Sequence, residues 1–259
     1  MTTHHHLVYD AATAPPTAAV VWLHGFGDAA EGWADEFREL RVAVPHVKWI
    51  HIRAPLRPQT CFNGFEVSSW GNYLDQGCTR IGSLDYDNEA IASYDALKDV
   101  HTVLDDLVTC MPLSRVVVGG FSMGATVAAE AALKYIHART SPSATTLGAL
   151  VLLNGYLLPG ARSLASDGAA SGLRVLVAHG TADEQVEYDC GAEAARALRE
   201  SCAEVTFSSF QGLDHAQSGF GPGKVAASDF IKAVVSSDVG STRCGNRKRR
   251  NNGECLAAP

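Results

Sequence analysis

Long apolar segments are missing from this sequence. No run of eighteen consecutive apolar residues occurs among its 259 residues, so we expect no membrane-spanning helix. The first six residues, MTTHHH, have neither a basic start nor an apolar core, and we therefore expect no secretory signal peptide. Without a signal or a span, a cytoplasmic location is the simplest expectation.

Paired cysteine motifs are missing as well. The seven cysteines are odd in number and scattered without C-x-x-C spacing, which argues against a zinc site and against a disulfide scaffold. A reducing compartment is the simplest interpretation. Cys61 and Cys78 fall in one long predicted loop, so a bond between them is kept as a minor alternative. The histidine triplet 4–6 is too short to assign as a metal site, and we expect none.

An excess of basic charge is missing from the chain as a whole, whose formal net charge is −7. We therefore expect no nucleic-acid partner. Four consecutive basic residues occur at 247–250, in a polar segment that predicts a disordered tail over 237–259. Such a tail is compatible with transient contact with an anionic membrane surface, although four basic residues in a solvated terminus usually make no such contact.

Internal repeats are absent, and the length leaves no room for a second domain. We expect a flexible N-terminus over 1–17, one domain over 18–236 and the basic tail beyond it. Apolar β-branched runs alternate with helical segments, which predicts an α/β fold with a mostly parallel sheet covered by helices on both faces. The expected strands are 19–23, 47–52, 115–118, 149–153, 174–178 and 205–210, and the expected helices are 34–40, 88–108, 125–138, 192–201 and 224–235.

The segment SRVVVGGFSMGATVA, residues 114–128, carries a G-x-S-x-G motif between a β-branched run and a small-residue run. This context predicts a nucleophile elbow, a strained strand-to-helix turn that raises the Ser122 hydroxyl above the sheet. Gly120 and Gly124 suit such a turn because a side chain at either position would collide with the neighbouring strand or helix. Ser122 is therefore the candidate nucleophile. The alternative is a serine that only caps a helix.

A serine hydroxyl needs a general base to act as a nucleophile at neutral pH. In α/β-hydrolases the acid and then the histidine follow the serine along the chain, which leaves His137, His179 and His215. His137 falls within the predicted helix after the elbow and His179 ends a predicted strand, so we expect neither to reach the serine. His215 lies in a loop after the predicted strand 205–210 and is the candidate base.

The acid is expected just beyond the end of a strand. The run RVLVAHGTAD ends at Asp183, which makes this carboxylate the leading candidate. Its competitors are Glu184, Glu187 and Asp189. The last two approach a predicted helix, where acidic residues are ordinarily partners of the helix dipole. Asp214 adjoins His215, but adjacent side chains seldom face one another, so we expect it to shape the turn.

An oxyanion needs two backbone N–H donors. One is expected at Met123, directly after the serine, and the other in the loop after the predicted strand 19–23. That loop reads HGFGD over 24–28, and its glycines let the backbone approach a substrate closely. The second donor is therefore expected near Phe26. The alternative is that HGFGD forms only a tight turn.

These motifs occur in an order that resembles the acyl-protein thioesterase, lysophospholipase and carboxylesterase family of α/β-hydrolases. LHGFGD at 23–28 is similar to the family's LHGxGD, GFSMG at 120–124 to GFSxG, LNGYL at 153–157 to LSGYL, HGTADEQV at 179–186 to HGxxDxxV, and GLDH at 212–215 to the segment bearing its histidine. The similarity covers about residues 18–235. The resemblance implies Ser122 as nucleophile, Asp183 as acid and His215 as base. It likewise implies oxyanion amides at Phe26 and Met123.

The chain departs from the family pattern at three places. Met123 stands where the family usually has glutamine, Ala125 replaces a glycine, and Glu187 stands where proline is common. None of these changes removes a catalytic side chain. They do mean that substrate preference does not carry over directly from the family.

The segment 53–84 is long and irregular, and such segments in compact domains are often lids. We expect it to bind substrate through Phe62, Phe65, Ser69, Trp70 and Tyr73. The resemblance implies the same, since the family has a Ser-Trp-containing segment here and uses the surrounding loop to shape an apolar channel for an acyl chain. The alternative is that these aromatic side chains fill a satellite core.

The predicted chemistry is acyl transfer through an acyl-enzyme on Ser122, with no metal or organic cofactor expected. The resemblance implies S-acylated proteins as substrates. Lysophospholipids and short-chain carboxylesters are alternatives, because all of these substrates pass through the same tetrahedral intermediate. A non-catalytic receptor on a hydrolase fold is the remaining alternative.

Overall fold

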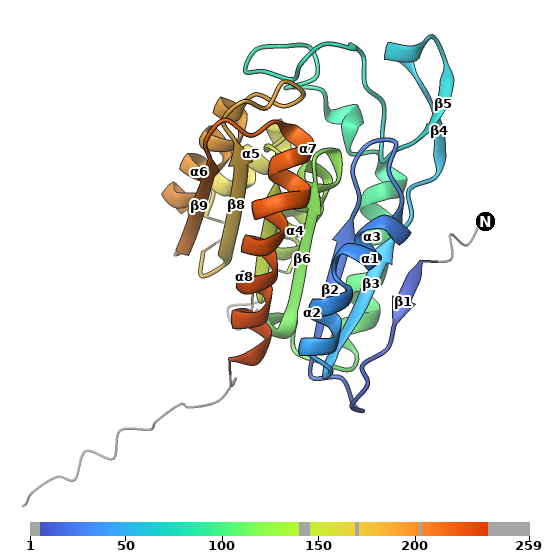
Figure 1. Cartoon of the computed structure of the whole chain (residues 1–259), viewed down its shortest axis with the longest axis vertical. Coiled ribbons are helices and arrows are strands. Elements are labelled where there is room, and N and C mark those ends of the chain that lie inside the picture. The colour runs from blue at the N-terminus through green and yellow to red at the C-terminus, as the bar shows by residue number, and fades with distance from the viewer. Residues whose placement is uncertain (1–5, 140–145, 169–170, 202–203, 238–259) are drawn as a thin grey trace, which may run out of the picture.

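The computed structural model describes residues 6–139, 146–168, 171–201 and 204–237. A seven-stranded sheet in the order β1-β3-β2-β6-β7-β8-β9 runs through the middle of the molecule (Figure 1). All neighbouring strands are parallel except β1, which pairs antiparallel with β3. The strands are β1 (Leu7–Tyr9), β2 (Ala18–Leu23), β3 (Val47–Ile52), β6 (Val116–Phe121), β7 (Ala149–Leu153), β8 (Arg174–Gly180) and β9 (Glu204–Phe210).

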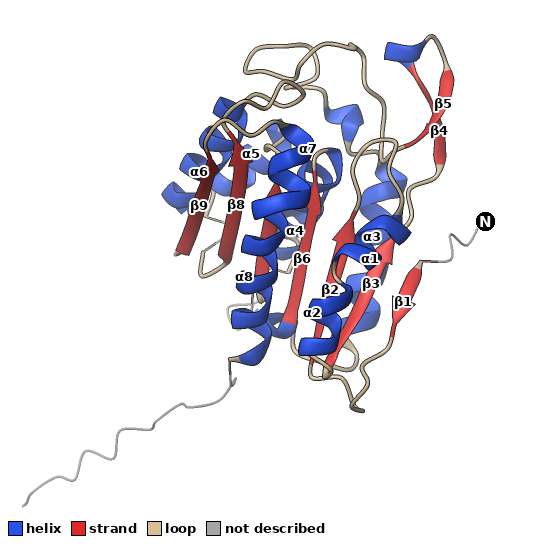
Figure 2. Cartoon of the chain, viewed as in Figure 1, coloured by secondary structure: helices blue, strands red, loops and turns tan. Residues whose placement is uncertain are grey.

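Helices cover both faces of the sheet (Figure 2), because successive strand side chains point to opposite faces. Val21 and Val118 belong to the core under α3, α4, α5 and α6, whereas Val20 and Val117 belong to the core under α1, α2 and α8. The predicted α/β architecture is confirmed. The helices are α1 (Ala30–Glu36), α2 (Arg38–Ala43), α3 (Tyr94–Val108), α4 (Met123–His137), α5 (Pro159–Ser166), α6 (Tyr188–Ser201), α7 (His215–Ser218) and α8 (Lys224–Ser236).

Several element boundaries differ from the sequence expectation. The expected helix 34–40 is two short helices, α1 and α2, that meet at Phe37. The expected helix 88–108 begins only at Tyr94, because the Ser93 side chain caps α3 there by accepting a hydrogen bond from Ala96 N at 3.2 Å. The expected helix 192–201 begins earlier, at Tyr188.

The N-terminal segment 1–17, expected to be flexible, contributes to the sheet. Residues 7–9 form the edge strand β1, in which Tyr9 pairs with Trp49 and Leu7 with His51. Three residues are too few for an alternating pattern to be recognised. The exposed edge of β3, rather than the local sequence, therefore determines this strand.

The segment 53–84 is not wholly irregular. It contains an antiparallel hairpin of β4 (Leu56–Gln59) and β5 (Phe65–Ser68), which projects beyond the carboxyl end of the main sheet (Figure 1). Gly27 N donates to Ser68 O at 2.9 Å, and Trp70 Nε1 donates to His24 O at 2.8 Å. The hairpin is thus tied to the turn that follows β2.

The expected tail over 237–259 lies outside the described residues except for Ser237, as do Cys202, Cys244 and Cys255. Among the described helices, none is both long enough and apolar enough to cross a membrane. The described cysteines, Cys61, Cys78, Cys110 and Cys190, are free thiols. The bond between Cys61 and Cys78 that the sequence left open is therefore not formed.

Candidate active site

Ser122 stands at the corner between β6 and α4, with φ 56° and ψ −126°. A Cβ atom at Gly120 would lie 2.6 Å from the Gly124 backbone, and one at Gly124 would lie 2.3 Å from His24 O. Both positions therefore require glycine, as the predicted strand–turn–helix corner demands. The strained backbone is the geometry that raises a serine hydroxyl above a sheet, and Ser122 lines a cavity there.

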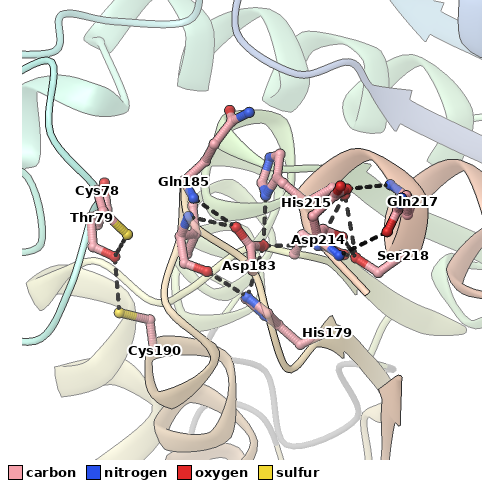
Figure 3. Close-up of polar contacts among 12 residues, drawn as sticks. Cys78, Thr79, His179, Asp183, Gln185, Cys190, Asp214, His215, Gln217 and Ser218 are labelled. Atoms are coloured by element: carbon pink, nitrogen blue, oxygen red, sulfur yellow. Dashed lines mark hydrogen bonds and ion pairs between the residues drawn. The ribbon is translucent and has the colours of Figure 1, made fainter. Parts of the chain in front are cut away.

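Asp183 follows β8 and accepts hydrogen bonds on both carboxylate oxygens (Figure 3). Its Oδ1 accepts the backbone N–H groups of Gln185 and Val186, both at 2.9 Å. Its Oδ2 lies 2.6 Å from His215 Nδ1 and 3.2 Å from His179 Nε2. The sequence competitors Glu184, Glu187 and Asp189 make no such contact with His215 in the described structure.

The charge state of Asp183 follows from these contacts. Burial alone would raise the pKa of its carboxyl, but the hydrogen bonds from His179, His215 and the Val186 amide outweigh burial and hold the pKa well below its ordinary value. Asp183 is therefore an anion at neutral pH. An anion bonded to Nδ1 fixes the imidazole tautomer and stabilises the imidazolium that forms when the ring takes a proton.

His215 begins α7, where it is buried against the ring of Phe121 with centroids 4.8 Å apart. Its bond to Asp183 through Nδ1 leaves Nε2 as the nitrogen that can take a proton from Ser122. No hydrogen bond joins Ser122 to His215 within the described residues, but both line the same cavity, and such bonds often tighten only when substrate binds. Asp214 shapes the turn as expected, since its side chain accepts from Gln217 N at 2.8 Å.

Two buried residues reach Asp183 that sequence reasoning did not assign to the site. His179 was excluded as a base, and the structure instead places it against the acid. Asn154 Nδ2 donates to Asp183 Oδ2 at 2.9 Å. Both residues lie at or just after the carboxyl ends of β7 and β8, which are adjacent parallel strands. Polar residues at neighbouring strand ends were the signal in the sequence that could have indicated them.

The loop after β2 is held rigidly around His24. Its Nδ1 lies 2.8 Å from Gly25 O, and its Nε2 accepts Ala54 N–H at 3.1 Å. Burial lowers the pKa of His24, which keeps Nε2 available as an acceptor. Within the described residues, neither the Phe26 nor the Met123 N–H is used by a protein acceptor. Both amides therefore remain available to an oxyanion, the role expected for them.

The cavity beside Ser122 has a volume of about 510 Å³, within the range of small-molecule sites. Of the expected substrate-binding residues, Phe62 and Tyr73 line it, and both pack on Phe26, with centroid distances of 6.0 and 5.1 Å. Phe65, Ser69 and Trp70 do not line it. Phe65 is 72% exposed, whereas Ser69 and Trp70 are buried. Hydrogen bonds with Gln59 and with His24, in the loop after β2, hold them there.

The charges around the cavity have one sign. The described lining residues include the carboxylates of Asp28, Asp75 and Glu184 and neither lysine nor arginine. Glu184 and Asp75 are exposed at the rim. Cys61 and Cys78 also line the cavity, and burial raises the pKa of both thiols, so both stay protonated and weakly nucleophilic at neutral pH. Among the described residues, no group of three or more His, Cys, Asp or Glu side chains is arranged to hold a metal ion.

A mostly parallel sheet with a serine at a strained strand-to-helix corner, and with an acid and a histidine in later loops, defines the α/β-hydrolase class. The chain belongs to the phospholipase/carboxylesterase family, whose model matches residues 4–234. It is therefore a hydrolase of that family.

Relatives and solved structures agree with this assignment. The chain is 29% identical to acyl-protein thioesterase 1 of Yarrowia lipolytica over 70% of this chain and 75% of the relative. It is 27% identical to acyl-protein thioesterase 1 of Mycosarcoma maydis over 77% and 85%. The crystal structure of Zea mays acyl-protein thioesterase 2 superposes with a TM-score of 0.66 at 26% identity, covering 89% of this chain and 99% of that chain. Arabidopsis thaliana SOBER1 gives 0.68 at 25% identity, covering 85% and 99%.

Proposed function

We propose that this hydrolase cleaves acyl thioesters through an acyl-enzyme on Ser122. His215 takes the serine proton as Oγ attacks the carbonyl carbon, and Asp183 stabilises the resulting imidazolium. The N–H groups of Phe26 and Met123 hydrogen-bond the oxyanion of the tetrahedral intermediate. His215 then returns the proton to the leaving thiol, and a water molecule activated by His215 hydrolyses the acyl-serine.

The 2.6 Å contact between His215 Nδ1 and the buried Asp183 carboxylate carries this proposal. A buried carboxylate held as an anion against a histidine is of little use to packing, but it is what a general base requires. Ser122 opens into the same cavity as His215. A purely binding role on this fold would leave both the strained serine and the contact between His215 and Asp183 without a purpose.

The proposed substrates are S-acylated proteins. The names of the relatives in Yarrowia lipolytica and Mycosarcoma maydis support a thioester, and the aromatic wall of Phe26, Phe62 and Tyr73 suits an acyl chain. The carboxylates at the rim, with no opposing cation among the lining residues, disfavour substrates with a polyanionic leaving group such as acyl-coenzyme A. A neutral or basic peptide around the acylated cysteine fits this rim better.

The first test is hydrolysis of p-nitrophenyl esters and thioesters of short to long acyl chain by the purified protein. We expect turnover of long-chain thioesters that falls by several orders of magnitude in Ser122→Ala and in His215→Ala. An S-palmitoyl peptide with lysine neighbours should be a better substrate than one with glutamate neighbours or palmitoyl-coenzyme A, and raised salt should reduce the difference.

Each other outcome favours a named alternative. Turnover confined to short esters would identify a general short-chain carboxylesterase, and preferential turnover of lysophosphatidylcholine would identify a lysophospholipase. Activity no higher than that of Ser122→Ala on every substrate would support the receptor alternative.

A further inference from the structure

Asn154 directly follows β7. In the sheet, β7 lies between β6, which leads to Ser122, and β8, which leads to Asp183. Its backbone has φ 51°, a left-handed conformation that asparagine and glycine tolerate best. Its side chain is fully buried, and its N–H donates to Ala178 O at 2.9 Å. The backbone of Asn154 therefore determines where its side-chain amide group lies.

A single amide nitrogen of Asn154 contacts the acid and the segment that carries the base. Nδ2 lies 2.9 Å from Asp183 Oδ2 and 3.2 Å from the backbone carbonyl oxygen of His215. It also lies 2.6 Å from Ser218 Oγ, in the last residue of α7. Asn154 thus joins the acid loop after β8 to the short helix that begins with the base.

The other half of the same amide has no partner. Asn154 Oδ1 is buried without a hydrogen bond in the structure, which is unfavourable for folding. A half-turn of the side-chain amide would place Oδ1 against the negatively charged Asp183 carboxylate, and the two oxygens would repel each other. The orientation in which Nδ2 donates to Asp183 is therefore the stable one. The bond that Nδ2 donates to the buried Asp183 anion is charge-assisted and therefore stronger than a neutral one, and it offsets the cost of the unpaired oxygen.

The groups that face Asp183 come from three elements. His179 lies on β8 and His215 at the start of α7. Burial, followed by the charges of Glu187 and Asp183, raises the pKa of the Cys78 thiol in the segment 53–84. Glu184 neighbours it in the acid loop, and Asp214 lies beside His215 with its carboxylate occupied by Gln217 N. No lysine or arginine makes an ion pair with Asp183 in the described structure. Neutral hydrogen-bond donors such as Asn154 therefore determine how much of the Asp183 carboxylate charge is available to His215.

We propose that Asn154 is a positioning residue for the catalytic acid and base, tying the Asp183 carboxylate to the backbone of His215 and taking up part of the carboxylate charge. This inference rests on the proposed function, in which His215 is the base. Two consequences follow. Loss of the amide should let Asp183 and His215 shift together relative to Ser122, which lowers kcat. Within the Asp183–His215 pair, it should leave the carboxylate charge more fully available to the imidazolium.

The test uses Asn154→Gly, which keeps the left-handed backbone and removes the amide, and Asn154→Ser, which restores one donor. Ser218→Ala is the matched control, because it removes a partner of the same amide without touching Asp183. For Asn154→Gly we expect kcat to fall roughly 10- to 100-fold with KM little changed, since Asn154 does not line the cavity. Asn154→Ser should recover part of this loss.

The pH profile separates positioning from packing. In Asn154→Gly, the Asp183 carboxylate no longer shares its charge with the Asn154 amide, so it stabilises the His215 imidazolium more strongly. The acid limb of the kcat/KM profile should therefore move to higher pH by on the order of 0.5 unit. Ser218→Ala should leave that limb in place. An acid limb that stays in place or moves to lower pH in Asn154→Gly would overturn the proposal and leave Asn154 with a packing role.

A readout without turnover keeps this inference separate from the proposed function. The His215 ring can be titrated by NMR, with the resonance assigned through His215→Gln. A higher titration midpoint in Asn154→Gly than in the wild type supports the inference even if no ester is hydrolysed. An unchanged midpoint contradicts it even if the enzyme is active.

Discussion

Asp183 shows how one residue is made both buried and charged. Two backbone N–H groups bind one of its oxygens, and side chains from three other elements surround the second. The favourable bonds exceed the cost of burial, so the carboxyl keeps a pKa below its ordinary value. An acid in this state can orient His215 without itself being protonated.

We expect Asp183→Asn to lower kcat by about 10⁴-fold while the protein stays folded. The amide that replaces the carboxylate would favour the wrong tautomer of His215, as it does in other serine hydrolases. Glu187→Gln is the matched control, because it neutralises a nearby carboxylate that has no contact with His215. Steady-state kinetics on one ester with both variants measure the effect, and equal losses in the two would assign the acid elsewhere.

The same substitution changes the dependence of stability on pH. Because the folded-state pKa of Asp183 is lowered, the unfolded chain takes up this proton first as pH falls. The contribution of Asp183 is therefore full at neutral pH, begins to fall near pH 4, the unfolded-state pKa, and is lost progressively as pH falls toward the lower folded-state pKa. The difference in urea midpoint between the wild type and Asp183→Asn should thus be largest near pH 7 and smaller at pH 3.

At the residue scale, the sequence predicts best those residues whose role depends on chain order. Ser122, Asp183 and His215 each occupy a place after a strand that local patterns indicate. Asn154 and His179 were not predicted, since their role comes from contacts across neighbouring strands. Such contacts depend on which strands are adjacent, and single-sequence patterns do not give strand order.

At the element scale, the corner between β6 and α4 depends on how closely two backbones approach. A Cβ atom at Gly124 would lie 2.3 Å from His24 O and 2.4 Å from Leu23 O. These are backbone atoms of the neighbouring strand and its turn, so they cannot move aside cheaply. Buried strands and the small-residue helix were predictable from the sequence, but the start of α3 was placed too early, because the predicted helix ran past the Ser93 cap.

We expect Gly124→Ala to lower the free energy of unfolding by about 1–3 kcal/mol, because it overpacks this corner. Gly32→Ala in α1 is the matched control, since its Cβ would meet only Asp28 Oδ1 at 3.6 Å. There, alanine should stabilise the helix by about 0.5–1 kcal/mol. Urea unfolding of both variants measures the difference. Equal stability of Gly124→Ala and the wild type would contradict the close approach.

At the scale of the whole molecule, the cavity is assembled from segments far apart in the chain. The loop after β2, the segment 53–84 and the loops after β8 and β9 meet at the carboxyl end of the sheet (Figure 1). Thr79 joins the segment 53–84 to the loop that carries Asp183, since its N–H donates to Gln185 O at 2.8 Å and its carbonyl accepts Glu187 N–H at 2.9 Å. The shape of the cavity therefore depends on the segment 53–84 as well as on the loops that carry Asp183 and His215.

The segment 53–84 is also where the sequence was least informative. Its hairpin exposes apolar residues such as Leu56 (65% exposed) and Phe65 (72% exposed). Hydrophobic periodicity predicts strands by the face they bury, so a hairpin that stands clear of the core gives little signal. Which of its aromatic residues reach the cavity depends on the hairpin's orientation, which is a property of the folded molecule.

Phe62 and Phe65 belong to the same hairpin segment, but only Phe62 lines the cavity. The two residues therefore test whether the acyl chain binds in the cavity. Phe62 lines the cavity beside Phe26, whereas Phe65 does not line it. We expect Phe62→Ala to reduce kcat/KM for long-chain relative to short-chain esters by about tenfold, the lower end of what one apolar contact contributes to specificity. Phe65→Ala should leave that ratio nearly unchanged. Equal effects of the two variants on the chain-length profile would mean that the acyl chain follows the outer face of the hairpin rather than the cavity.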